Sequence, residues 1–340
     1  MRAPWKRILV LVTAMFALTG TTVACIPDPG VPTTTSTSTS TSSTSSTIPV
    51  EGCNFSVRVG VPDSLIAKYG GLNATLALAN QQFADINSHF TGFTKPPRFA
   101  ITDMYTFSND PMTQLYEPHP GTDFLLVYSE IPNQRSGWVG FNNSITANWP
   151  AASGGIFATE ATNGFVHEFG HSRGGVDLYQ LEVPASGNPI GGGGYAAPES
   201  IMTTYGSYTW DSYTTSIINA SRCDIYQGAP VVNQSLPPTY SVRTTPGASV
   251  SIYPVDWNSY RVTSTAVLNG TVATDGTWLL PENPFRPNSV GYPWDMRYPN
   301  FLIKASAGGR VGYRWLSLVD AGNWFFAHPG EPYQITISLS

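Results

Sequence analysis

The segment from residue 167 to residue 177, HEFGHSRGGVD, constrains this chain more than any other stretch. His167 and His171 are four residues apart, which places both imidazoles on one face of an α-helix, one turn apart. Two imidazoles on a shared face can bind a zinc ion at roughly 2.0–2.1 Å each. Glu168 is rotated away from the pair, so its carboxylate can reach a water at the metal rather than the metal itself. The pattern predicts a helix that carries a metal site.

The six residues after His171 complete that site. A catalytic zinc site needs a third protein ligand and one open position. Gly174 can take a positive φ at no steric cost, so it can end the helix and turn the chain back. Asp177 then reaches the metal from a different direction than the helix. We predict one zinc ion held by His167, His171 and Asp177; the alternative is a solvated helix end with incidental histidines.

The whole pattern HExxHxxGxxD resembles that of the metzincin metallopeptidases, in which a methionine turn follows the third ligand. Residues 199–202, ESIM, resemble that turn and imply that Met202 lies beneath the imidazoles. Most metzincins use histidine as the third ligand, and the aspartate here is similar to the snapalysin-like branch. The family also implies that Tyr205 ligates zinc or stabilises the oxyanion, although its spacing from Met202 is one residue longer than the family pattern.

The resemblance implies an exported zinc-dependent metalloendopeptidase that acts on protein or peptide substrates. Zinc would lower the pKa of its water toward about 7 and polarise the scissile carbonyl. Glu168 would be the general base that takes the water proton and delivers it to the leaving amine. A peptidase of narrow specificity, such as an aminopeptidase, is the alternative with the same chemistry.

A rival from another class is a surface adhesion or binding protein whose zinc site is structural or inactive. A structural zinc site is closed by four protein ligands, and only three are evident here. An inactive site usually loses its general base, and Glu168 is present. Both observations favour the enzyme. For the oligomeric state, a monomer is the default expectation.

The N-terminus resembles a bacterial signal peptide over residues 1–24. A positively charged start precedes an apolar run from Ile8 to Leu18, which is too short to span a bilayer comfortably. Small residues ending in Cys25 resemble a lipobox, which implies a lipid anchor on Cys25 and a cell-surface lipoprotein. Cleavage after Ala24 and secretion is the alternative.

Residues 25–52 are expected to form a disordered tether, because positions 33–47 are almost entirely Ser and Thr and cannot bury a core. With Cys25 set aside, Cys53 and Cys223 form an even pair, which in an exported chain suggests a disulfide. Cysteine as a metal ligand is the weaker alternative. The net charge is −5 and only 11% of residues are charged, so the sequence has no basic patch that would bind nucleic acid.

Residues 53–230 are predicted to form an α+β, metzincin-like domain with a mixed sheet. Apolar residues alternate in 55–59 as in a strand, and they recur at spacings of three and four in 72–86 as in a helix. Further strands are expected at 99–101, 124–128, 138–141 and 155–158. The metal-binding helix is expected to begin at Thr159 or Thr162, either of which can cap it. A helix over 212–222 should follow the methionine turn. In metzincins an edge strand above the cleft pairs with the substrate, and 154–158 is the candidate here.

Residues 231–340 are predicted to form an all-β sandwich of transthyretin or immunoglobulin type. Apolar residues alternate in 248–252 and 335–339, Asp275-Gly276 signals a turn, and Leu316 and Leu318 suggest a short strand. Helical periodicity is not evident. The four glycines at 191–194 are expected to form either a loose surface loop or a mobile wall of the substrate pocket.

Overall fold

The computed structural model describes residues 52–134, 136–204, 207–221, 223, 230–256, 258–285 and 298–340. Four sequence predictions lie outside these ranges: the signal peptide at 1–24, the lipidation site Cys25, nearly all of the tether at 25–52, and the role of Tyr205. Within the described ranges, no helix is both long and apolar enough to cross a membrane.

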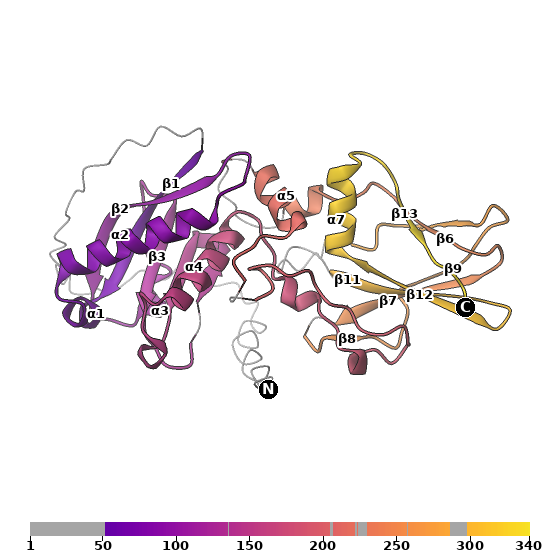
Figure 1. Ribbon diagram of the computed structural model, residues 1–340, viewed down its shortest axis with the longest axis horizontal. Helices are drawn as coiled ribbons and strands as arrows, with labels where there is room; N and C mark the ends of the chain where they lie inside the picture. The colour runs from indigo at the N-terminus through magenta and orange to yellow at the C-terminus, as the bar shows by residue number, and fades with distance from the viewer. Residues whose placement is uncertain are drawn as a thin grey trace, which may run out of the picture. The chain divides into compact units, whose positions relative to one another are not determined.

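The first part of the described chain forms a five-stranded mixed sheet in the order β2-β1-β3-β5-β4 (Figure 1). Its strands are β1 (Cys53–Pro62), β2 (Pro97–Phe107), β3 (Phe124–Ser129), β4 (Gly137–Val139) and β5 (Ser144–Asn148). All neighbours are parallel except β4, which runs antiparallel to β5. The predicted alternation is confirmed in β1, where Phe55, Val57 and Val59 are buried.

Helices that accompany this sheet are α1 (Asp63–Lys68), α2 (Leu72–His89), α3 (Pro111–Gln114) and α4 (Thr159–Ser172), with 3₁₀ turns η3 (Gly140–Asn142) and η4 (Ala151–Ser153). The predicted long helix is α2, and it buries Ala79, Phe83 and Ile86. It lies beside α4 on the sheet (Figure 1). The Phe169 ring of α4 packs 5.9 Å from Phe83 and 4.1 Å from Phe99, so α4 is anchored to both α2 and β2.

The segment before α4 differs from the prediction. Residues 155–158 form a turn and not a strand, because Gly154 and Gly155 both adopt positive φ and the Ile156 N–H bonds to the Glu130 carboxylate at 3.0 Å. The candidate edge strand at 154–158 is therefore wrong; the two edge strands of the sheet are β2 and β4. Helix α4 does begin at Thr159, but its N-cap is Ala158 and no side chain caps it.

The second part of the described chain contains two further sheets. One has the order β10-β6-β13 and the other β12-β11-β7-β8, with β9 also paired to β7. Their strands are β6 (Tyr240–Arg243), β7 (Ser249–Asp256), β8 (Arg261–Val262), β9 (Leu268–Thr271), β10 (Thr277–Leu279), β11 (Asn300–Ala307), β12 (Arg310–Ser317) and β13 (Tyr333–Thr336). A sandwich of transthyretin or immunoglobulin type stays a prediction.

This part is not all-β as predicted, because α7 (Leu318–Ala327) follows β12 directly. Ser317 begins the helix through a capping box, in which its side chain accepts from the Asp320 N–H and Asp320 accepts from Ser317. Leu316 ends in the strand and Leu318 starts the helix, so their spacing of two spans a junction and is not a strand pattern. Helix α7 packs on α5 (Ser212–Ser221), where a Cβ at Gly322 would meet the Tyr213 ring at 2.2 Å.

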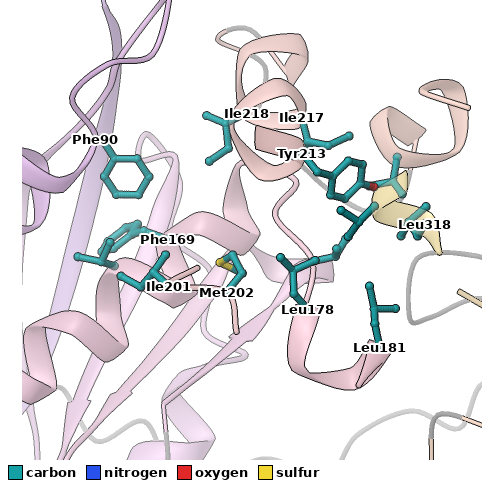
Figure 2. Packing of buried hydrophobic residues seen from close by; sticks show 14 of the residues in the cluster. Phe90, Phe169, Leu178, Leu181, Ile201, Met202, Tyr213, Ile217, Ile218 and Leu318 are labelled. Atoms are coloured by element: carbon teal, nitrogen blue, oxygen red, sulfur yellow. The ribbon is translucent and has the colours of Figure 1, made fainter. Parts of the chain in front are cut away.

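The predicted boundary between two domains, at residues 230 and 231, stays a prediction. The described residues on both sides belong to one compact unit, and α6 (Pro230–Gln234) spans the proposed boundary. A single buried apolar cluster also joins the two parts (Figure 2): Met202, Ile217 and Leu318 all belong to it. The predicted Cys53–Cys223 disulfide is confirmed, and it joins the start of β1 to a residue just after α5 across 170 positions.

Candidate metal centre

Helix α4, which carries the two histidines predicted to bind a metal, is buried rather than solvated. Every residue of α4 from Ala161 to Gly170 is buried, and the side chains of His167 and Glu168 are 2% and 3% exposed. A buried histidine beside a buried carboxylate, with the half-buried His171 one turn away, is not an incidental solvated helix end, because such groups are costly to bury without partners.

Three side-chain atoms converge at the end of this helix. His167 Nε2 lies 3.0 Å from Asp177 Oδ1, His171 Nε2 lies 3.1 Å from the same oxygen, and the two Nε2 atoms are 3.1 Å apart. Ligand atoms of a tetrahedral zinc centre with bonds of about 2.0–2.1 Å lie roughly 3.3 Å from one another. Among the residues that the structure describes, this is the single group of His, Cys, Asp and Glu side chains spaced for a metal.

The protonation of the two imidazoles supports the same reading. His167 Nδ1 lies 2.9 Å from the Ile201 carbonyl oxygen, and His171 Nδ1 lies 2.9 Å from that of Gly175. A carbonyl only accepts, so each Nδ1 carries a proton, and Nε2 is the nitrogen that each ring turns toward Asp177. The two Nε2 atoms and a carboxylate oxygen then face one point, an arrangement in which a bound cation would contact all three atoms. The residues therefore fit a zinc ion.

The predicted helix-ending turn at Gly174 is confirmed. Gly174 has a φ of 92° and follows the C-cap Arg173. The Gly174 N–H bonds to the His171 carbonyl at 2.9 Å, and the Gly175 N–H bonds to the Gly170 carbonyl at 2.9 Å. These two bonds define a Schellman motif. The motif brings the Gly175 carbonyl to the His171 ring, so the turn that redirects the chain also orients the second ligand.

The third ligand stands at the start of the short 3₁₀ helix η5 (Leu178–Leu181). Asp177 Oδ1 faces the histidines, while Oδ2 accepts from Gln180 Nε2 at 3.1 Å. Sequence reasoning did not identify Gln180, although an amide three residues after a carboxylate ligand is a signal that could have. Its bond fixes which carboxylate oxygen faces the metal.

Met202 lies in a tight turn against the metal-binding helix. It is fully buried, and its carbonyl accepts from the Leu178 N–H at 3.0 Å. Figure 2 shows Met202 beside Ile201 and Leu178. The Ile201 carbonyl contacts His167 Nδ1, and Leu178 directly follows Asp177. The turn thus contacts the segments of two ligands; the family's supporting role for Met202 stays a prediction.

The two carboxyl groups of the site, Glu168 and Asp177, have pKa values shifted in opposite directions. Burial raises the pKa of Glu168 above its ordinary value, although the nearby His167 and His171 and a hydrogen bond from the Trp138 main chain oppose the rise. Burial alone would also raise the pKa of Asp177, but both histidines outweigh it and hold that pKa well below its usual range. Asp177 is thus the permanent anion, and Glu168 is suited to accept a proton.

Aromatic residues surround the ligands. The Trp138 ring, from edge strand β4, stacks on His171 with ring centroids 6.3 Å apart, and the Tyr179 ring stacks on His167 at 6.4 Å. Tyr260, on the turn between β7 and β8, is half-buried, and its pKa is raised by burial and by the charges of Asp177 and Glu182. No local sequence signal identifies Trp138 or Tyr260, since both come from distant segments.

Comparison with known protein families and with curated proteins finds no match. Among solved structures, one described as "Structure of a chaperone-substrate complex" aligns with 12% identity and a TM-score of 0.35. The alignment covers 51% of this chain and 34% of the other. A likeness of this size carries no argument about fold or function.

Proposed function

We propose that this chain is an exported zinc-dependent metalloendopeptidase. The observation that supports the proposal most is the convergence of His167, His171 and Asp177 on one point beside a buried carboxylate, Glu168. Three protein ligands leave one position open, as a catalytic zinc site requires and a structural site does not. The rival adhesion or binding function has no comparable observation in its favour.

The reaction divides between the ion and the chain. Zinc, when bound, supplies a Lewis acid that polarises a carbonyl and lowers the pKa of water toward about 7. His167, His171 and Asp177 would hold it, and the Ile201 and Gly175 carbonyls accept from the two Nδ1 atoms and so orient both Nε2 atoms toward the ion. Glu168 takes a proton on its carboxylate from the attacking water and transfers it to the nitrogen of the leaving amine. The hydrogen bond from the Trp138 main chain orients that carboxylate.

The edge of the sheet offers a place for the substrate. Strand β4 is paired on one side only, with β5, and it carries Trp138 next to Glu168 and His171. An extended peptide can add to such an edge through main-chain hydrogen bonds. We assign β4 this role in place of the segment at 154–158.

The test compares the full chain with its Glu168→Gln variant on an unstructured protein substrate, with zinc quantified in both. We expect about one zinc per chain in each and cleavage by the wild type alone. Full activity of Glu168→Gln would remove the general-base assignment. Zinc without cleavage by the wild type would favour the binding-protein alternative, and a wild type without zinc would refute the metal centre.

The proposed location rests on the sequence and on the disulfide. A disulfide such as Cys53–Cys223 persists in oxidising compartments, which agrees with export. We propose that Cys25 carries a lipid anchor. Metabolic labelling with a fatty acid should mark the wild type and not Cys25→Ser; labelling of neither would favour release after signal cleavage.

A further inference from the structure

The chain that follows the third ligand has little regular structure of its own. We call residues 177–195 the ligand strap. It contains η5, the 3₁₀ turn η6 (Ala185–Gly187) and a single antiparallel bridge between Val183 and Tyr195. Such a segment cannot fix the position of Asp177 alone, so contacts from outside the strap must do so.

We propose that the C-terminal sheets are part of the metal centre, because they clamp the ligand strap and thereby position Asp177. Asn300, at the start of β11, and Tyr313, on β12, are the positioning residues. This inference rests on the proposed zinc site, but it does not depend on peptidase activity.

The first contact fixes η5 at its two ends. At its start, the Leu178 N–H donates to the Met202 carbonyl at 3.0 Å. At its end, Asn300 Nδ2 donates to the Leu181 carbonyl at 2.9 Å, across 119 positions of sequence. Leu178, Leu181 and Asn300 are all fully buried. Figure 2 shows Leu178 beside Met202 and Leu181 on the next turn of chain. Asp177 and its partner Gln180 therefore lie on a short element held from both sides.

The second contact fixes the glycine-rich part of the strap. The Tyr313 hydroxyl donates to the Ile190 carbonyl at 3.2 Å. Its ring lies so close to the strap that a Cβ at Gly192 would meet Tyr313 atoms at 2.6 Å. Asn188 Nδ2 bonds to the carbonyls of Gly191 and Gly193, both at 2.6 Å. In this arrangement Gly191, Gly192 and Gly193 all have positive φ, and the predicted mobility of the glycine segment stays a prediction.

The end of the strap is held in the same way. The Tyr195 hydroxyl donates to Ser317 Oγ at 2.8 Å, and Ser317 Oγ in turn bonds to Asp320 in the α7 capping box. Val183 packs in one apolar cluster with Val255, Val262 and Leu302 of the C-terminal sheets. Contacts with the C-terminal sheets thus recur along the strap, at Leu181, Val183, Ile190 and Tyr195.

Loss of the contact that Asn300 or Tyr313 makes with the ligand strap should weaken metal binding. Partners outside the ligand shell typically contribute roughly 10–100-fold to metal affinity, because they orient the ligands. Removal of the Asn300 amide leaves the buried Leu181 carbonyl without its donor and releases the end of η5. Asp177 then loses its fixed approach to the histidines.

The experiment is a zinc titration of the metal-free full chain in competition with a chromophoric chelator. The variants are Asn300→Ala and the milder Tyr313→Phe, which removes only a hydroxyl. The matched controls are Asn269→Ala at an exposed position of β9 and Tyr240→Phe on β6. Asn269 bonds to Ser251, and the Tyr240 ring packs on Phe285 and Tyr333, so neither side chain is part of the clamp. Thermal midpoints of the metal-free proteins are recorded alongside.

We expect a zinc Kd raised roughly 10–100-fold in Asn300→Ala and several-fold in Tyr313→Phe, with both controls near the wild type. A lower thermal midpoint with an unchanged Kd would show a merely structural role and overturn the proposal. If Asn300→Ala does not fold, Tyr313→Phe decides the matter by the same criterion. A wild type that binds zinc but cleaves nothing would refute the peptidase function and leave this inference standing.

Discussion

Gly170 lies directly against the sulfur of Met202: a Cβ built on Gly170 would be 3.0 Å from Met202 Sδ and 3.0 Å from the Trp210 ring. Helix α4 thus approaches the turn that contains Met202 as closely as a glycine permits. This approach allows the Ile201 carbonyl, one residue before Met202, to accept from His167 Nδ1 at 2.9 Å. Gly170 therefore supports the hydrogen bond between the Ile201 carbonyl and His167 Nδ1, because its missing side chain allows this close approach.

The first prediction follows from this contact. Gly170→Ala should lower the free energy of unfolding by about 1–3 kcal/mol, because the methyl group overpacks the Met202 contact. It should also weaken zinc binding through His167. The matched control is Gly164→Ala on the same helix, where an added Cβ has no neighbour closer than 3.8 Å. That variant should be neutral or gain up to about 1 kcal/mol from helix propensity. Urea denaturation of both proteins tests this, and equal stabilities would contradict it.

The second prediction concerns the third ligand. Asp177→Asn keeps the shape of the side chain and removes the charge that faces both imidazoles. We expect zinc affinity to fall by more than about 100-fold, since loss of an outer partner alone costs roughly 10–100-fold. Asp275→Asn, on an exposed turn, makes the same change of charge far from any ligand and should bind zinc as the wild type does. Retained affinity in Asp177→Asn would mean that another residue is the third ligand.

The cluster of His167, His171 and Asp177 could be predicted from sequence because its geometry is local. The spacing of His167 and His171 fixes a helix face, and the positive φ of Gly174 turns the chain within six residues of His171. By contrast, the Ile201 carbonyl and the Asn300 amide reach the site by tertiary packing, which no short pattern encodes. The correctly predicted elements, such as β1 and α2, likewise have a local pattern of apolar residues.

The two misassigned elements have local causes as well. Residues 155–158 contain a short apolar pair, but Ile156 lies in a turn whose main-chain N–H bonds to Glu130, and its side chain is buried by packing in the main apolar cluster and not by sheet pairing. Helix α7 starts immediately after β12 with no loop between them, and its capping box at Ser317 is the signal that would have revealed it.

The third prediction is a pH dependence of the metal-free protein. Burial alone would lower the pKa of His171, but the Asp177 and Glu168 carboxylates outweigh it and raise the pKa to about 9. A raised pKa means that the folded state binds this proton more tightly than the unfolded state does. The resulting stability is complete below the ordinary histidine pKa of about 6.5 and is lost as the pH rises to about 9.

Urea denaturation of the metal-free chain between pH 6 and pH 10 should therefore show a fall in the free energy of unfolding over that window. Asp177→Asn should flatten the fall, because it removes the principal charge that retains the proton. Zinc-saturated wild type should also lack it, since the metal takes the place of the proton at Nε2. A wild-type stability that stays level or rises across this window would contradict the assignment.

The fourth prediction concerns the disulfide, which closes a loop of 170 positions and ends two residues after Ser221. Ser221 Oγ accepts from the Arg173 guanidinium at 2.9 Å, and Arg173, fully buried at the end of the metal-binding helix, also lies 4.5 Å over the Phe55 ring. The Cys53→Ser, Cys223→Ser double variant should lose about 2–5 kcal/mol of stability. The disulfide also secures Ser221, which accepts from Arg173 at the end of α4, so we expect weaker zinc binding as well.

Cys25→Ser is the matched control. It should change neither the zinc affinity in the metal titration nor the stability in urea denaturation. A double variant that loses stability but keeps its zinc affinity would separate the disulfide from the metal centre.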